Sequence, residues 1–367
     1  MSLSHLWNGV IFGGAIMGFL IGAGFASGQE ILTFYTHLGF IGSLAGGLFS
    51  MLVLAVVFAA IMEDGRKLQC QDTNSIFDYY CGKYLGPLLK WAVAIVMFLV
   101  TSIMFSGAGA TLEQQYGLAP VVGRLSMAII TILTVVLGLK NLVNVVGAIA
   151  PVIAIFAIAV GIAGVVSNPA GVTGSDALIA SLKLNAPYPN WWATGFMYAA
   201  YLTMGMVPFI CGVGAQARTR GEAVGGGIFG SVGFMLGAMA LGFGMMAHIQ
   251  EVHSMEIPAL GLLGSNSPVI SNIFAVALML AIYTTAVPML WTAVNKLAPV
   301  DGTVKYRLLT VVLGVIALFG GLFKFSTMVG IVYPALGWIG MLIITCMIWK
   351  KIRVGFQRGH SHPVQGK

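Results

Sequence analysis

Apolar residues make up 58% of the 367-residue chain, and charged residues make up only 8%. Soluble domains carry about 25% charged residues, so this composition excludes a soluble globular protein and indicates a polytopic membrane protein. The net charge of +7 does not indicate a nucleic-acid partner, because most basic residues fall in short loops on one side of the expected spans.

Ten apolar stretches are long enough to cross a bilayer, which takes about 20 residues of helix. In chain order they cover roughly residues 6–36, 40–62, 86–111, 120–139, 142–166, 191–215, 223–247, 268–295, 304–323 and 326–349. We therefore expect an all-α polytopic membrane protein that forms a single transmembrane domain over residues 1–367. Residues 353–367 are polar and are expected to form a disordered cytoplasmic tail.

The basic residues support this set of spans. If both termini lie in the cytoplasm, only Arg124, Lys183 and Lys324 of the 18 lysines and arginines fall on the outer side. An excess of Lys and Arg marks the cytoplasmic loops of membrane proteins. We therefore expect a multi-pass protein of the cell membrane with cytoplasmic N- and C-termini.

The first span contains a break between Ile21 and Glu30, where the sequence reads Ile-Gly-Ala-Gly-Phe-Ala-Ser-Gly-Gln-Glu. Its three glycines each weaken a helix by roughly 1 kcal/mol relative to alanine. Lipid cannot satisfy the backbone groups that a broken helix leaves unpaired, so the break must line a cavity or pack inside the protein. We expect the solute site here.

Glu30 lies within a span rather than at its end. With Ser27 it has the spacing of a capping box, in which the two residues bond the first turn of a restarting helix. Intramembrane carboxylates are also functional hypotheses by default. Three roles stay open at this stage: a helix cap, a protonatable coupling group and a contact to the solute.

The chain matches itself at an offset of 183 residues without gaps, which pairs Gly22 with Gly205 and Pro151 with Pro334. The offset covers five spans, an odd number, so the second half must enter the membrane from the opposite side. This predicts a 5+5 inverted repeat, with repeat one at about 5–167 and repeat two at about 188–350. Secondary transporters are commonly built in this way, with the site between paired broken helices.

The sixth span has its own reason to open, because Pro208 lacks an N–H and leaves the carbonyl of Met204 without its helical partner. The alternative is a proline kink that neighbouring helices repair. Two facing breaks would present N–H groups, at Ala23 to Phe25, to a carboxylate and free carbonyls to a cation. The expected substrate-binding residues are Gly22, Ala23, Gly24, Phe25, Ala26, Tyr201, Met204, Gly205 and Met206. Ordinary helix packing is the alternative for the side chains among them and for Tyr198.

Thr284 and Thr285 form a polar pair deep in the eighth span, one turn after Ala281. Each hydroxyl could bond a carbonyl of its own helix, which membrane helices tolerate. The same patch offers one carbonyl and two hydroxyls, and such neutral oxygens suit Na⁺ better than a divalent ion. No cofactor other than Na⁺ as a coupling ion is expected.

Together, the Gly22-Ala23-Gly24 break, the Gly205/Pro208 pair and Thr284-Thr285 resemble the LeuT-type fold of the amino acid–polyamine–organocation superfamily. The sequence from Gly22 to Ile31, together with Phe34 and Gly39-Phe40, resembles that of the YkvI-type membrane proteins. The resemblance implies ten helices, with helices 1 and 6 broken at mid-membrane. It also implies that Gly22-Ala23-Gly24 receives the substrate carboxylate.

The same resemblance implies a sodium site. Carbonyls at Gly18 and Ile21 and at Ala281, with the hydroxyls of Thr284 and Thr285, stand where the family holds its conserved Na⁺. Proton-coupled relatives can place a lysine of the fifth helix at this position. Lys140 is near the start of that helix and too shallow to substitute, so Na⁺ is preferred to H⁺.

The sequence therefore predicts a Na⁺-coupled symporter for a small amino acid or a related carboxylate. A proton-coupled transporter and a membrane ligand sensor of similar fold are the alternatives. A channel is disfavoured because the polar residues cluster at one depth. An enzyme is not expected, because no Ser/His pair, paired aspartates or metal-ligand set falls at depth. The expected partners are a small molecule and the lipid bilayer, and the oligomeric state stays open.

Overall fold

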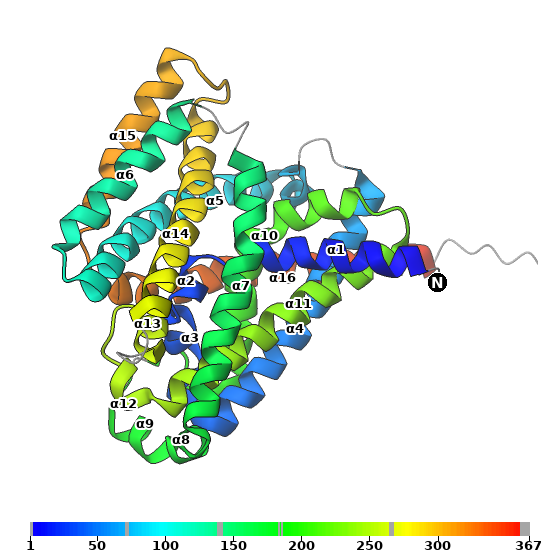
Figure 1. The fold of residues 1–367 in the computed structure, drawn as a ribbon. Coiled ribbons are helices and arrows are strands. Elements are labelled where there is room, and N and C mark those ends of the chain that lie inside the picture. Colours follow the sequence, from blue (N-terminus) through cyan, green and yellow to red (C-terminus); the bar gives the residue numbers. More distant parts are fainter. Residues whose placement is uncertain are drawn as a thin grey trace, which may run out of the picture.

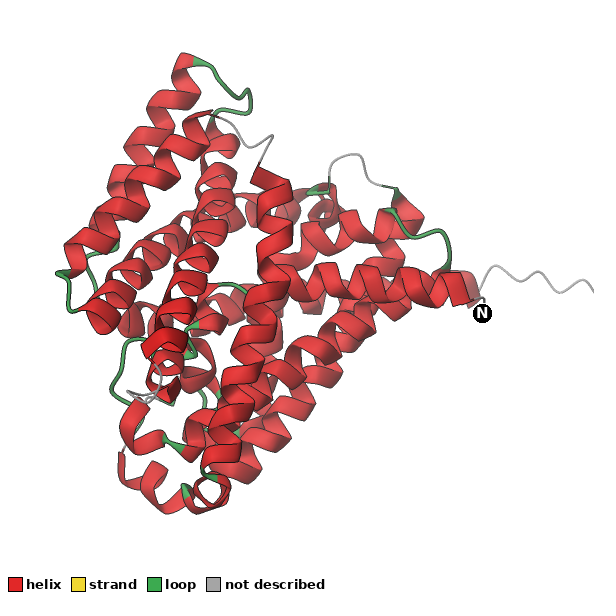
Figure 2. Ribbon diagram, viewed as in Figure 1, coloured by secondary structure: helices red, strands yellow, loops and turns green. Residues whose placement is uncertain are grey.

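The computed structural model describes residues 3–69, 73–137, 142–182, 184, 186–263 and 268–359, and over these residues every regular element is a helix (Figure 2). The long helices are α1 Leu3–Leu20, α4 Gly39–Leu68, α5 Ser75–Tyr116, α6 Pro120–Leu137, α7 Leu142–Ser167, α10 Trp191–Ala215, α11 Arg220–Ala247, α14 Pro268–Leu297, α15 Val304–Gly320 and α16 Phe325–Gly359. The short ones are α2 Ala23–Ala26, α3 Gln29–Phe34, the 3₁₀ turn η1 Thr36–Leu38, α8 Pro169–Gly174, α9 Asp176–Leu182, α12 Ile249–Val252 and α13 Pro258–Leu263.

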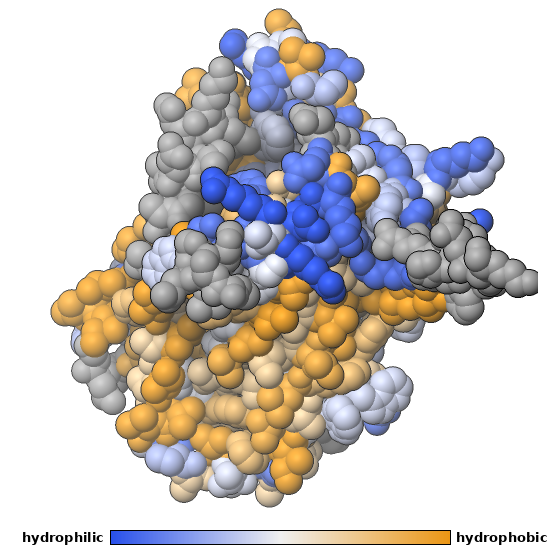
Figure 3. Space-filling view, turned by 90° about the vertical axis from the view of Figure 1, so that its right-hand side faces the viewer, coloured by the Kyte–Doolittle hydropathy of each residue, from blue (hydrophilic) through white to orange (hydrophobic). Residues whose placement is uncertain are grey.

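Seven of the described helical segments are long and apolar enough to cross a membrane. Two shorter apolar helices, Trp7–Leu20 and Ile153–Ser167, add to them. On the face shown in Figure 3, a continuous apolar surface lies below an area where hydrophilic side chains gather. The protein is thus a multi-pass membrane protein, as the composition predicts.

The first span is interrupted close to the expected position. Helix α1 ends at Leu20, and helical backbone resumes only at Ala23. Gly22 there is extended, with φ −96° and ψ −172°. A second interruption follows at Gly28, whose φ of +81° lies in the left-handed region that favours glycine. These two interruptions bound the short helix α2 and separate it from α1 and α3. Helices α2 and α3 lie among the longer helices of the fold (Figure 1).

The predicted break in the sixth span is wrong. Helix α10 runs without interruption from Trp191 to Ala215, with Pro208 inside it. Proline removes one N–H from the ladder, and a membrane helix tolerates that loss when neighbouring helices pack around it. Helix α10 has such neighbours, since it packs against both α4 and α16.

Two other helices run further than expected. Helix α5 joins the polar stretch before the third span to the span itself, across a kink at Gly82 where φ is +76°. Helix α16 continues to Gly359, so the first residues of the expected disordered tail are helical. The rest of that tail, residues 360–367, lies outside the described residues.

Long helices of the first half of the chain pack against long helices of the second half. Helix α1 packs along α11, and α10 packs along α4. Both interfaces bring backbones together at glycines. A Cβ at Gly230 would lie 2.9 Å from the Gly13 carbonyl oxygen, and one at Gly195 would lie 2.7 Å from that of Gly46. Small residues allow this close approach between membrane helices. Helix α5 also packs on α14, and α6 packs on α15 (Figure 1).

Candidate functional site

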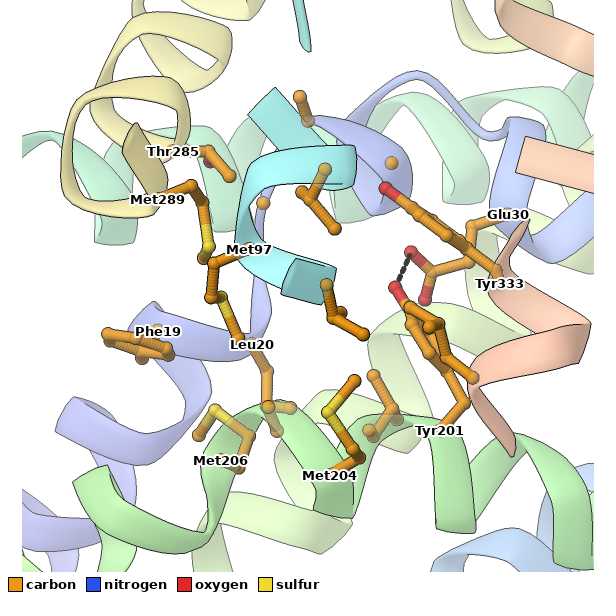
Figure 4. A pocket seen from close by; sticks show the side chains of 18 of the residues that line it. Phe19, Leu20, Glu30, Met97, Tyr201, Met204, Met206, Thr285, Met289 and Tyr333 are labelled. Atoms are coloured by element: carbon orange, nitrogen blue, oxygen red, sulfur yellow. Dashed lines mark hydrogen bonds between the residues drawn. The ribbon is translucent and has the colours of Figure 1, made fainter. Parts of the chain in front are cut away.

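A cavity of about 100 Å³ lies where α1 gives way to α2. Residues of α1, α2, α3, α5, α10, α14 and α16 line it. The lining residues are Phe19, Leu20, Gly22, Ala23, Gly24, Glu30, Val96, Met97, Val100, Met104, Tyr201, Leu202, Met204, Gly205, Met206, Thr285, Met289, Tyr333 and Leu336. In Figure 4, Thr285 and Met289 lie on one side of the α1–α2 interruption and Glu30 and Tyr333 on the other.

Gly22, the N-cap of α2, and Gly24, within α2, lie next to different side chains. A Cβ at Gly22 would lie 3.3 Å from the Thr285 hydroxyl oxygen. A Cβ at Gly24 would lie 2.7 Å from Glu30 Oε2 and 3.0 Å from the Tyr333 hydroxyl oxygen. The interruption thus meets a hydroxyl of α14 at its first glycine and a carboxylate at its second. The first N–H groups of α2 have no intrahelical acceptor.

Glu30 is held by tyrosines of α10. Its side chain is buried, with 3% of the residue exposed. The hydroxyl of Tyr198 donates to Oε1 at 2.7 Å, and the hydroxyl of Tyr201 points to Oε2 at 3.4 Å. The Tyr201 ring in turn stacks on Tyr333 of α16, with centroids 4.7 Å apart. The carboxylate is therefore fixed between α3, α10 and α16 and borders the cavity.

The interpretation of Glu30 and Ser27 as a capping box is wrong. The residue at the cap of α3 is Gly28, which has no side chain to bond the first turn. Ser27 Oγ accepts a hydrogen bond from the Gln29 N–H at 3.3 Å, but the Glu30 carboxylate bonds tyrosines instead of completing the box. Ser27 Oγ donates to the Gly24 carbonyl at 2.8 Å. The left-handed Gly28 turns the chain between the two residues, so the Glu30 carboxylate reaches the tyrosines and not the backbone of Ser27. A complete capping box does occur elsewhere, between Thr219 and Glu222 of α11.

The three expected sodium ligands on α14 lie together. Thr284 Oγ1 donates to the Ala281 carbonyl at 3.0 Å, and Thr285 Oγ1 donates to the same oxygen at 2.8 Å. The hydroxyl oxygens keep lone pairs that can accept a cation. Gly18 lies in the last turn of α1 and Ile21 directly after it. Of these five residues only Thr285 lines the cavity.

Two of the expected substrate-binding residues do not face the cavity. Phe25 is fully buried and packs against Phe234 of α11, with ring centroids 5.1 Å apart. Ala26 is also buried and is absent from the lining. Because α2 is helical, its side chains point in different directions around the axis. Those of Phe25 and Ala26 point away from the cavity, into the contacts with neighbouring helices. The other seven substrate-binding residues predicted from sequence line the cavity.

The far side of the α2–α3 turn is covered by the segment before α14. The Ala259 N–H of α13 donates to the Ser27 carbonyl at 2.9 Å. Gln114 at the end of α5 holds the same segment, since its amide bonds both the carbonyl of Ile257 at 2.9 Å and the N–H of Ile257 at 3.0 Å. The segment before α14 therefore holds the α2–α3 turn through a backbone hydrogen bond and is itself held by α5.

Comparison with curated proteins gives two relatives from Bacillus subtilis (strain 168). The uncharacterized protein YyaD is 23% identical over 340 residues, which cover 91% of this chain and 94% of YyaD. The uncharacterized membrane protein YkvI is 31% identical over 113 residues, which cover 30% of this chain and 31% of YkvI. No family model matches the chain.

Among solved structures, MhsT in complex with L-phenylalanine superimposes with a TM-score of 0.62 at 18% identity, over 91% of this chain and 87% of MhsT. A mutant of the manganese transporter of Eremococcus coleocola superimposes with a TM-score of 0.55 at 14% identity, over 94% of this chain and 78% of the transporter. The chain has the LeuT-type fold. The resemblance predicted from the sequence is confirmed.

Within this LeuT-type fold, sequence reasoning missed the walls of the cavity that α5, α14 and α16 supply. Met97 and Met104 of α5 and Met289 of α14 line it with Met204 and Met206 of α10. The sequence carries no signal for this, because methionines at helical spacing also describe ordinary membrane-helix packing. Tyr333 was missed for the same reason.

Lys140, on which the preference for Na⁺ over H⁺ partly depends, lies outside the residues that the structure describes. Lys140 falls between the end of α6 and the start of α7, in residues 138–141. The preference for Na⁺ therefore depends on the threonine pair of α14.

Proposed function

We propose that the protein is a secondary transporter that carries a small amino acid or a related carboxylate together with Na⁺. One observation carries the proposal. The interruption between α1 and α2 borders a cavity, and Thr285 of α14 faces it across Gly22. This proximity supports an ion shared by α14 and the interrupted helix next to the solute.

The sodium ion would be held by Thr284, Thr285 and the Ala281 carbonyl, with the carbonyls of Gly18 and Ile21 on the α1 side. The two hydroxyls would rotate their hydrogens away from Ala281 and turn their oxygens to the ion. Bound Na⁺ would tie α14 to the interruption and favour the arrangement that binds solute. By linkage, solute would raise the affinity for Na⁺ by the same factor.

The proposed substrate contacts use the same interruption. The N–H groups of Ala23, Gly24 and Phe25 lack intrahelical acceptors and suit a carboxylate. Tyr201, Met204, Gly205 and Met206 border the rest of the solute. Methionine side chains are flexible and polarizable, so such a wall can accept several shapes of apolar group.

We further propose that the ten long helices form an inverted 5+5 repeat in the cell membrane, with both termini in the cytoplasm. The pairs α1–α11 and α10–α4 support the repeat, because each joins the first helix of one half to the second helix of the other. The matching pairs α5–α14 and α6–α15 also support it. Alternating access would move one repeat against the other.

Proteoliposomes test the function. Purified protein is reconstituted and supplied with a tritium-labelled mixture of amino acids under an inward Na⁺ gradient, with choline as the matched control. We expect accumulation in Na⁺ and counterflow against unlabelled amino acids. Equal uptake in choline would remove Na⁺ from the mechanism, and absence of any uptake or counterflow would overturn amino acid transport.

Proton coupling is the second candidate, because Glu30 borders the cavity and is buried inside a membrane protein. It predicts accumulation under an inward pH gradient with choline replacing Na⁺, abolished by a protonophore. The same vesicles decide between the two ions.

A further inference from the structure

We propose that Glu30 binds the ammonium group of the transported solute, so that the carboxylate-bearing solute must also carry an amine. The proposal rests on the transport function above and narrows it. A carboxylate that lacks an amine would not be a substrate.

Among the residues that the structure describes, Glu30 forms no ion pair with a lysine, arginine or histidine. The ion pairs formed by described lysines, arginines and histidines involve other acids, and the cavity lining contains no basic side chain. A buried carboxylate without a counter-charge is unfavourable in a low-dielectric interior. The tyrosine hydroxyls reduce this cost but do not neutralise the charge. A cation that enters the cavity would neutralise it.

The two carboxylate oxygens differ in how far they are occupied. Oε1 accepts a hydrogen bond of 2.7 Å from Tyr198, which anchors the side chain to α10. Oε2 has only the longer 3.4 Å approach of Tyr201, and it lies over Gly24, where the missing Cβ leaves space. A carboxylate oxygen can accept about two hydrogen bonds. Oε2 is therefore the oxygen with capacity left, and the Glu30 side chain lines the cavity.

Aromatic rings surround this oxygen. Tyr201 lies between Tyr333 and Phe34, with ring centroids at 4.7 Å and 5.9 Å and interplanar angles of 21° and 13°. The face of an aromatic ring carries partial negative charge and attracts an ammonium group. The opposite wall is made of methionines and Phe19, which suit an apolar group (Figure 4). The cavity thus has one charged end and one apolar end.

The charge also argues against an amine-free acid. A carboxylate at the α2 glycines would lie next to Glu30 Oε2, which is 2.7 Å from the Cβ position of Gly24. Two neighbouring negative charges repel each other, and the low dielectric of a membrane-protein interior makes this repulsion more unfavourable than it is in water. An ammonium on the atom beside the solute carboxylate removes the conflict, because it lies between the two negative groups.

Three probes with the same branched apolar body test the proposal: L-leucine, isopentylamine, which lacks the carboxylate, and isocaproate, which lacks the amine. Binding is measured by isothermal titration to the purified full-length protein in Na⁺. We expect L-leucine and isopentylamine to bind and isocaproate to bind at least tenfold more weakly. In Glu30→Gln the two amines should lose roughly 30-fold or more in affinity, as expected for removal of one partner of a buried charge pair.

Glu222→Gln is the matched control. Glu222 is also a fully buried glutamate, but it closes the capping box of α11 and does not line the cavity. A capping box accepts glutamine, so this variant should keep the wild-type order of the three probes. If Glu30→Gln does not fold, the order of the probes on the wild-type protein decides alone.

The outcomes separate the two proposals. Isocaproate binding as tightly as isopentylamine overturns the assignment to Glu30 and leaves the transport of carboxylates standing. Glu30→Gln binding both amines with wild-type affinity also overturns it. Absence of binding by every probe overturns it as well, and only the absence of uptake and counterflow in vesicles would remove the transport function.

Discussion

Replacing Gly24 with alanine is expected to damage the site through sterics alone. Gly24 lies in the helical segment α2 and does not have a positive φ, so alanine can adopt its backbone conformation. The new methyl group would lie 2.7 Å from Glu30 Oε2 and 2.9 Å from the Tyr333 ring carbon Cε2. Favourable carbon contacts need about 3.5–4.0 Å, so the carboxylate or the ring must move by close to 1 Å.

The size of the effect follows from this displacement. An extra methyl group in a well-packed core costs about 1–3 kcal/mol. Alanine regains up to about 1 kcal/mol through its better helix propensity, so the apparent melting temperature should fall only slightly. Solute affinity has no such compensation, because the displaced group borders the cavity. A loss of about 1–3 kcal/mol corresponds to a roughly 5–150-fold weaker affinity.

The assay measures L-leucine affinity by isothermal titration and the melting temperature of the solute-free protein. Gly14→Ala is the control, because it lies in α1 and a Cβ there would meet nothing within 4 Å. Gly22→Ala is intermediate, since its Cβ would lie 3.3 Å from the Thr285 hydroxyl oxygen, and its loss should appear mainly in the Na⁺ dependence. Wild-type affinity in Gly24→Ala would refute the placement of the solute beside Glu30.

Three other variants have expected outcomes. Thr284→Val combined with Thr285→Val keeps the side-chain shape and removes both hydroxyls, so the roughly 5–150-fold gain in solute affinity expected from Na⁺ should disappear, as measured by titration in Na⁺ and in choline. An equal response in the wild type and the double variant would place the ion elsewhere. Gln114→Met removes both bonds to Ile257 and should raise hydrogen exchange in residues 256–260, whereas unchanged protection would show that the tether is dispensable. Thr219→Ala removes the side-chain cap of α11 and should cost about 0.5–2 kcal/mol in stability, seen as a lower melting temperature with the order of the three probes unchanged.

The sequence by itself determined the kind of protein and the position of the interruption in the first span. Composition and the length of the apolar stretches predicted a multi-pass helical membrane protein, because a bilayer demands apolar spans of a fixed length. The glycines around Gly22 predicted the end of α1, since the low helix propensity of glycine acts locally. Gly22-Ala23-Gly24 and Thr284-Thr285 also gave the resemblance to the LeuT-type fold.

The tertiary structure alone decided which side chains meet at the site. The spacing of Ser27 and Glu30 predicted a cap, but the hydroxyl of Tyr198, 168 residues further along the chain, takes the carboxylate instead. Pro208 predicted a break, but α10 stays continuous between α4 and α16. Local sequence reports what a segment prefers on its own. Whether Glu30 caps a helix or faces a cavity depends on partners that only the packing of distant helices supplies.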